Sequence, residues 1–198
     1  MGRPAKFDRD DVVRVAMNVI WKKGYGDCSI KALSESLGIT RSSLYNAFES
    51  REQIFQEALD AYSLQSPDIA FEDADENTPI LPLINKVFRE VCKVRAADPE
   101  ARGCLVINCL AEGGDTNQEV ALMLENIMKR NLEQFEKLLR LAAKRGEIPQ
   151  ERNDRETALA LQNLLIGVNM ISKVVREESD LRAIVRRTLI GLGLYVED

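Results

Sequence analysis

Histidine is absent from the 198 residues of this sequence. Because histidine is the most common general base near neutral pH and the most common metal ligand, its absence counts against a hydrolytic or zinc-dependent enzyme. The cysteines Cys28, Cys92, Cys104 and Cys109 form no C-x-x-C pair, the usual spacing of zinc and thioredoxin-like motifs. We therefore expect no metal, no cofactor and mostly free thiols.

Long apolar runs are also missing. No run approaches the roughly 18 apolar residues that indicate a membrane-spanning helix. The first residues, MGRPAKFDRDD, are polar and lack the apolar segment of a secretory signal. The composition, 45% hydrophobic and 30% charged, is that of an ordinary globular protein. These features predict a cytoplasmic protein that does not enter a membrane.

Charge is distributed unevenly along the chain. The net charge of −5 combines +2 in residues 1–55 with −7 in residues 56–198. A mildly positive first segment suits a small module that contacts a polyanion, and the acidic remainder suits a body that does not.

Apolar residues recur at helical spacing almost everywhere, and no strand alternation is visible. Capping residues and glycines divide the pattern into about nine helices, so we expect an all-α fold. Residues 66–79, acidic and bracketed by Pro67 and Pro79, predict a flexible or irregular linker. The expected helices cover residues 8–23, 30–37, 41–48, 51–63, 80–97, 103–112, 117–145, 154–177 and 180–195.

The stretch SIKALSESLGITRSSLYNAF, residues 29–48, is typical of a helix-turn-helix: a two-turn helix, a glycine turn and a second short helix. Its apolar residues, including Leu33, Leu44 and Phe48, are spaced to pack the two helices together. We assign residues 1–50 to a DNA-binding domain and residues 51–198 to an effector-binding and dimerisation domain. The side chains expected to face outward are Arg41, Ser42, Ser43, Tyr45 and Asn46.

These outward side chains suit the DNA major groove. Arginine can bind guanine through two hydrogen bonds, asparagine can do the same for adenine, and hydroxyls reach phosphates. Arg3 lies in a short Gly-Arg-Pro arm that can enter a minor groove. A solvated helical hairpin with a disordered terminus is the alternative. The predicted DNA-binding residues are Arg3, Ser29, Thr40, Arg41, Ser42, Ser43, Tyr45, Asn46 and Arg51.

From Phe7 to about Tyr62 the sequence resembles the DNA-binding domain of the TetR family of transcriptional regulators. The resemblance rests on the GRP arm, on AMNVIWKKGY, on SIKALSESLGITRSSLYNAFESREQIF, and on the distances between them. It implies a homodimer with a three-helix head and a helical body that binds a small effector. Such a protein is usually a repressor that its effector releases from a near-palindromic operator. Two departures are Asn46-Ala47, where histidine or other polar residues are frequent, and Arg51, where lysine is commoner.

The last two long helices provide a candidate dimer interface. Residues 154–177 carry one apolar stripe through Leu161 and another through Leu164, so this helix needs two partners. TetR-like proteins usually dimerise through a bundle of these two helices. The alternative is that both stripes are buried within one subunit. The predicted interface residues are Leu161, Leu165, Val168, Val185, Leu189 and Leu192.

Cys104, in the segment ARGCLVINCLAEGGD, lies near a helix N-terminus and beside Arg102. This setting lowers the pKa of a thiol. The segment is similar to the corresponding helix in electrophile-sensing TetR members of the N-ethylmaleimide reductase repressor type, which implies a sensor thiol. The alternative is a small core residue.

An effector pocket with apolar walls and a few amides would suit a small ligand of modest polarity. Each candidate can equally be a core residue. The other functions that the sequence leaves open are a helical protein-interaction adaptor and, with less support, a cysteine-dependent enzyme. The candidate pocket residues are Phe88, Cys92, Cys104, Asn108, Ile127, Met128 and Asn131.

Overall fold

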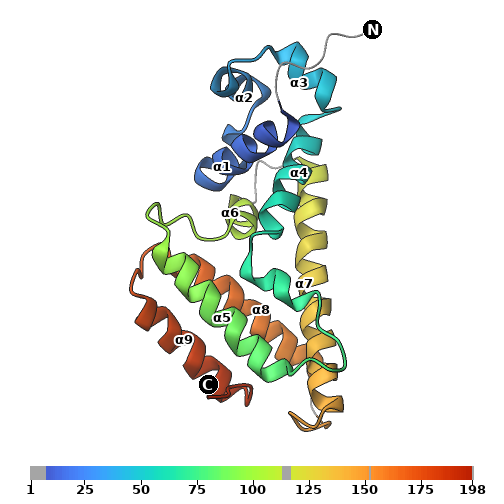
Figure 1. The fold of residues 1–198 in the computed structure, drawn as a ribbon, viewed down its shortest axis with the longest axis vertical. Coiled ribbons are helices and arrows are strands. Elements are labelled where there is room, and N and C mark those ends of the chain that lie inside the picture. Colours follow the sequence, from blue (N-terminus) through green and yellow to red (C-terminus); the bar gives the residue numbers. More distant parts are fainter. Residues whose placement is uncertain (1–7, 113–116, 152, 198) are drawn as a thin grey trace. The chain divides into compact units, whose positions relative to one another are not determined.

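The computed structural model of the protein describes residues 8–112, 117–151 and 153–197, and over these ranges it contains nine α-helices, one 3-10 helix and no strand (Figure 1). The all-α prediction is confirmed for this part of the chain. The helices form two compact units. We call residues 1–65 with 104–125 the head, and residues 66–103 with 126–198 the body.

Five helices and the start of a sixth make up the head. The long first helix packs against the second, the fourth and the sixth, so the head extends beyond residues 1–50. Its elements are α1 (Arg9–Asp27), α2 (Ile30–Leu37), α3 (Arg41–Ala47), α4 (Arg51–Ser63), α6 (Leu105–Glu112) and the first residues of α7 (Gln118–Lys144).

Helix α1 begins where the sequence predicts and ends later. The Asp8 carboxylate accepts a hydrogen bond from the Asp10 N–H at 3.0 Å and caps the helix. The expected end near residue 23 corresponds to a break at Gly24, whose φ of 84° and ψ of 172° are not helical. The chain is helical again up to Asp27, and the Arg51 guanidinium donates to the Tyr25 and Gly26 carbonyl oxygens of this last turn.

The body is built on one continuous apolar core. Helix α5 packs against α8 and α9, which pack against each other, and the three lie side by side in Figure 1. The remainder of α7 adds buried side chains such as Phe135 and Leu138 to the same core. The elements that lie wholly within the body are η1 (Pro67–Phe71), α5 (Ile80–Ala97), α8 (Asp154–Ile171) and α9 (Glu178–Gly191).

Two expectations for the body are wrong. Residues 66–79 are not an irregular linker, because η1 buries Phe71 with its ring 5.6 Å from that of Phe135. Helix α8 ends at Ile171 rather than near residue 177. Beyond it, the Arg176 guanidinium donates to carbonyl oxygens at the end of α5, including Ala96 O at 2.9 Å, so this segment caps α5 instead of continuing α8.

Candidate nucleic-acid interface

Local capping defines the two short helices of the head. The Ser29 hydroxyl accepts from the Ala32 N–H at 3.1 Å and begins α2. Gly38 ends α2 in the left-handed region, with a φ of 64°, which costs glycine little. The Thr40 hydroxyl then accepts from the Ser43 N–H at 3.1 Å and begins α3. Each cap satisfies backbone donors that a helix start leaves unpaired.

Three apolar side chains hold α3 against the rest of the head. Leu33 on α2, Leu44 on α3 and Phe48 at the end of α3 are buried, as their spacing predicts. Because Leu44 is the buried residue within α3 itself, the opposite side of this helix is left to solvent.

The exposed side of α3 carries the polar side chains that the sequence singles out. Arg41, Ser42, Tyr45 and Asn46 are exposed, and the Tyr45 side chain is 57% exposed despite its aromatic ring. The hydroxyl of Thr40 lies 2.9 Å from that of Ser42 and 2.8 Å from that of Ser43. One helix surface therefore presents a guanidinium, an amide, a phenol and a group of hydroxyls, which can donate to and accept from base edges and phosphates.

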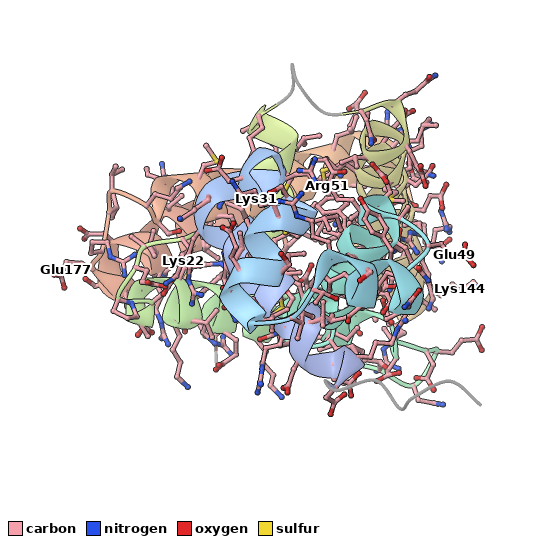
Figure 2. The ribbon with its side chains drawn as sticks, turned by 90° about the horizontal axis from the view of Figure 1, so that it is seen from above. Lys22, Lys31, Glu49, Arg51, Lys144 and Glu177 are labelled. Atoms are coloured by element: carbon pink, nitrogen blue, oxygen red, sulfur yellow. The ribbon has the colours of Figure 1, made fainter. Side chains whose placement is uncertain are left out.

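Arg51 has a different place from the one expected. Its guanidinium donates to Cys28 O at 2.8 Å, to Gly26 O at 3.1 Å and to Tyr25 O, and it lies 3.8 Å from the centre of the Tyr25 ring. Arg51, labelled in Figure 2, therefore caps the end of α1 from within the head. Its contact with a DNA phosphate stays a prediction. Arg3 lies outside the described residues.

Tyr25 is the centre of a polar junction in the head. Its hydroxyl donates to Glu52 at 3.0 Å, and Asn117 donates to the same carboxylate. Burial raises the pKa of the Tyr25 hydroxyl far above its ordinary value, although the Arg51 cation opposes this. Burial also acts to raise the pKa of Glu52, but the hydrogen bonds that it accepts outweigh burial and leave that pKa low. Glu52 is therefore an acceptor at neutral pH.

The four cysteines differ in burial. Burial raises the thiol pKa of Cys28 and Cys92 to about 11, and that of Cys109 to about 12. These thiols are protonated and unreactive at neutral pH. Cys104 is half-buried and lies just before α6, where its carbonyl oxygen accepts from the Asn108 N–H at 2.9 Å. All four cysteines are free thiols, and Cys104 is the one of the four that is partly accessible to solvent.

Arg102, the expected activator of Cys104, is committed to acidic partners. Its guanidinium forms ion pairs with Asp98 at 3.1 Å and with Glu100 at 3.5 Å. The Asp98 carboxylate is itself buried and also accepts from the Arg102 N–H at 2.9 Å. The positive charge beside Cys104 in the sequence is thus largely balanced within the body.

The predicted pocket residues are divided between the head and the body. Phe88 and Cys92 are fully buried in the body core. Asn108 belongs to the head, where its amide donates to Trp21 O at 3.4 Å. Three further predicted pocket residues lie on α7 and are half-buried: Ile127, Met128 and Asn131.

The predicted dimer residues face the core of their own chain. Five of them are core residues of a single chain, each no more than 8% exposed, and Leu192 packs against the same core. Side chains with so little free surface cannot form most of an interface with a second subunit. The sequence shows two apolar stripes on α8 but not which one faces inward. The five buried residues are Leu161, Leu165, Val168, Val185 and Leu189.

Exposed apolar side chains also occur on α8 and α9, on α9 beside charged ones such as Arg186 and Arg187. Leu159 is 46% exposed, Val174, just beyond α8, is 79% exposed, and Ile190 on α9 is 45% exposed. Met170 and Ile171 are exposed at the end of α8. We call these five residues the outer face. Exposed apolar side chains gathered on neighbouring helices mark a surface for another protein chain.

Two other features are absent from the described ranges. No cluster of three or more potential metal ligands occurs there. No helix in those ranges is long and apolar enough to cross a membrane.

A helix-turn-helix whose second helix turns a polar surface to solvent defines the chain as a DNA-binding regulator. Residues 12–58 match the sequence family described as bacterial regulatory proteins, tetR family. Residues 81–188 match the family described as the tetracyclin repressor-like C-terminal domain. The chain belongs to the TetR family of transcriptional regulators, and it is a regulator rather than an enzyme.

Two transcriptional regulators are similar to this protein over most of both chains. The HTH-type transcriptional regulator YezE of Bacillus subtilis is 27% identical over 89% of this chain and 92% of its own. The HTH-type transcriptional repressor ComR of Escherichia coli is 26% identical over 99% of this chain and 92% of its own. Such coverage means that head and body are both shared with these relatives.

Solved structures agree with the fold. A cysteine-substituted variant of the TetR family regulator CifR, bound to a 26-base-pair double-stranded operator, superposes with a TM-score of 0.83 at 29% identity. The match covers 96% of this chain and 98% of that one. A TetR regulator from Chloroflexus aurantiacus has a TM-score of 0.76 at 21% identity, over 93% of both chains, and supports the fold alone.

Proposed function

We propose that this protein is a cytoplasmic, homodimeric repressor that binds a near-palindromic operator through two copies of α3. A small effector that acts on the body then releases it. The observation that carries the proposal is the exposed polar surface of α3, held in place by buried Leu44 and Phe48. CifR, which has a similar fold and was solved with operator DNA, supports the DNA-binding role.

Each side chain of that surface has a proposed role. Arg41 is suited to guanine and Asn46 to adenine, since each can form two hydrogen bonds with that base. Tyr45 and Ser42 are suited to binding phosphates. Ser29 and Thr40 lie at the starts of α2 and α3 and are suited to the same contact. The remaining candidates are Ser43 and, in the arm before α1, Arg3.

The dimer uses the outer face rather than the residues first predicted from the sequence. The outer face is apolar, exposed and formed by the last two long helices, the pair through which TetR-like proteins usually dimerise. A two-fold dimer presents two α3 helices to half-sites about one or more DNA turns apart, which requires a near-palindromic operator.

Fluorescence anisotropy on the DNA upstream of this protein's own gene tests the DNA-binding role. We expect tight binding at moderate salt, and a scrambled duplex of the same composition should bind far more weakly. Arg41→Gln should lower the specific affinity by about 1–3 kcal/mol, roughly 5- to 150-fold. Lys86→Gln, which removes an equal charge from an exposed position on α5, is the control. Equal binding to both duplexes by the wild type would contradict the proposal.

The same titration identifies the kind of effector. Cys104 is the candidate for a sensor thiol, because the other three thiols are buried with raised pKa values. Release of DNA by N-ethylmaleimide in the wild type but not in Cys104→Ser would assign sensing to this thiol. DNA binding that survives the reagent would leave Cys104 as a structural residue and favour a reversible ligand of the body.

A further inference from the structure

One side chain joins three helices of the head at the end of α3. Arg9, the first residue of α1, donates from Nε to Glu57 Oε2 on α4 at 3.0 Å, and from a terminal nitrogen to Glu57 Oε1. Its other terminal nitrogen donates to the carbonyl oxygen of Ala47, the last residue of α3. The guanidinium also lies 4.0 Å from the centre of the Phe48 ring. We call Arg9 and Glu57 the α3 clamp.

Helix α3 needs such a contact because it is short. An isolated helix of seven residues is unstable in water, so packing must determine both its existence and its direction. Leu44 and Phe48 anchor α3 through apolar contacts. Such contacts are not directional, so they restrain the direction of the helix less than a hydrogen bond does. A hydrogen bond to the last carbonyl of α3 adds a directional restraint, and it places a positive charge at the negative end of the helix dipole.

The clamp is too exposed to be explained by stability alone. The side chains of Arg9 and Glu57 are 42% and 29% exposed. Ion pairs with this much solvent contribute little to the free energy of unfolding. The planar arginine fork, however, meets the carboxylate with two parallel hydrogen bonds and keeps a third donor for Ala47, which fixes a geometry that lysine cannot reproduce.

We infer that Arg9 and Glu57 are positioning residues that set the direction of α3 and thereby the sequence specificity of DNA binding. This inference rests on the proposed function of α3. Arg9 reaches α3 through its last carbonyl and needs no contact with DNA for this role, and Glu57 contributes by holding the guanidinium in place.

The competing role for Arg9 is a direct contact with a DNA phosphate, and Glu57 separates the two. If Arg9 binds phosphate, Glu57→Gln removes a competing negative charge and should strengthen binding to any duplex. If Arg9 positions α3, Glu57→Gln releases the guanidinium and should weaken specific binding. The two roles therefore predict opposite signs for the same substitution.

The experiment uses the full-length protein and the duplex that the wild type enriches from a random-sequence library. Anisotropy gives the affinity for this duplex and for a scrambled copy, each over a range of salt. The variants are Arg9→Gln, Arg9→Lys, Glu57→Gln and the double variant Arg9→Gln/Glu57→Gln. Arg14→Gln is the matched control, because it removes the same charge from an exposed position on the same helix.

We expect Arg9→Gln and Glu57→Gln each to lower specific affinity by about tenfold, and the double variant to lose little more than either alone, because both break one network. Affinity for the scrambled duplex and the salt dependence should stay near those of the wild type and of Arg14→Gln. Arg9→Lys should recover only part of the loss, since it keeps the charge and loses the fork.

Hydrogen exchange of the free protein supplies a readout without DNA. Both single variants should exchange faster at the amides of α3, including the Phe48 N–H, which bonds to Leu44 O at 2.9 Å. Exchange in α5 should not change. This result separates a local loss of position from global unfolding.

Three outcomes overturn the inference. Stronger DNA binding by Glu57→Gln, or full recovery by Arg9→Lys with a salt slope reduced by about one in Arg9→Gln, would make Arg9 a phosphate contact. Unchanged specificity in both single variants would leave the clamp without a role. If the wild type enriches no duplex, the proposed DNA-binding function fails as well, which is distinct from a specific wild type with unaffected clamp variants.

Discussion

The third and fifth helices illustrate two different ways of holding a helix in place. Helix α3 has seven residues and buries Leu44, whereas α5 has 18 residues and buries nine. Helix α3 is therefore oriented by its N-cap and by one hydrogen bond from Arg9, and α5 by a continuous apolar core. Burial of apolar area supplies most of the free energy of folding, while hydrogen bonds supply direction. Stability should thus reside in the body and precise geometry in the head.

Loss of a core side chain in the body is the largest effect that this comparison predicts. Leu161→Ala should lower the free energy of unfolding by about 2–5 kcal/mol, because a fully buried side chain leaves a cavity. Thermal and urea unfolding measure this loss. The dimerisation constant should change little at temperatures where the variant is folded.

Leu159→Ala, two residues away on the outer face, is the matched control. Because Leu159 is 46% exposed, its truncation should leave the unfolding of the single chain nearly unchanged. It should instead weaken the dimer, as sedimentation equilibrium measures. If Leu161→Ala changed the dimerisation constant more than Leu159→Ala does, the dimer interface would be the buried stripe. The predicted difference between the two faces of α8 would then be wrong.

The break in α1 tests the head. Gly24→Ala should cost about 1–3 kcal/mol, since a φ of 84° with a ψ of 172° is accessible almost only to glycine. An added Cβ would also lie 1.8 Å from Glu112 Oε1, and Glu112 would have to release the Tyr25 N–H, to which it is bonded at 3.1 Å. Unfolding measurements with DNA titration would report both stability and head geometry.

Gly26→Ala makes the same chemical change two residues further on. Nothing lies within 4 Å of the Cβ that it would add, so this variant should be neutral or slightly stabilising. Equal losses in both variants would mean that the break at Gly24 carries no specific strain, and that the head is less dependent on local geometry than we infer.

The sequence predicts α2, α3 and α4 to within one residue, because the side chains that cap their starts are close in the sequence. Ser29, Thr40 and Ser50 each accept from a backbone N–H three residues ahead, a signal that needs no tertiary information. The exposed polar surface of α3 was predictable for the same reason, since Leu33, Leu44 and Phe48 identify the buried side by spacing alone.

What the sequence could not predict depends on contacts distant in the chain. Arg51 resembles a free cation at a helix start, but its carbonyl partners lie more than 20 positions earlier. Arg9 has no visible function until the fold brings Ala47 and Glu57 beside it. On α8 both stripes are apolar, so periodicity identifies a helix with two partners and cannot decide which stripe faces its own core.

The smallest effect that we predict concerns a directional contact in the body, the cap that Glu147 forms at the start of α5. Glu147 accepts from the Ile80 N–H at 3.1 Å and the Leu81 N–H at 2.8 Å at the start of α5, and Arg145 donates to it at 2.6 Å. Glu147→Gln should cost about 0.5–2 kcal/mol, as loss of a charged helix cap does. Burial acts to raise the pKa of Glu147, but these hydrogen bonds outweigh it and hold the pKa below its ordinary value.

The pH dependence of that loss separates a charged cap from simple packing. Because the folded pKa is lowered, the carboxylate stabilises the fold fully above its unfolded pKa of about 4.3, and this contribution is lost as pH falls through the folded pKa. The difference between wild type and Glu147→Gln, from urea unfolding, should therefore be constant near pH 7 and shrink below about pH 4. A difference that does not change with pH would mean that Glu147 acts through its shape, and the body would then rely on packing even at the start of α5.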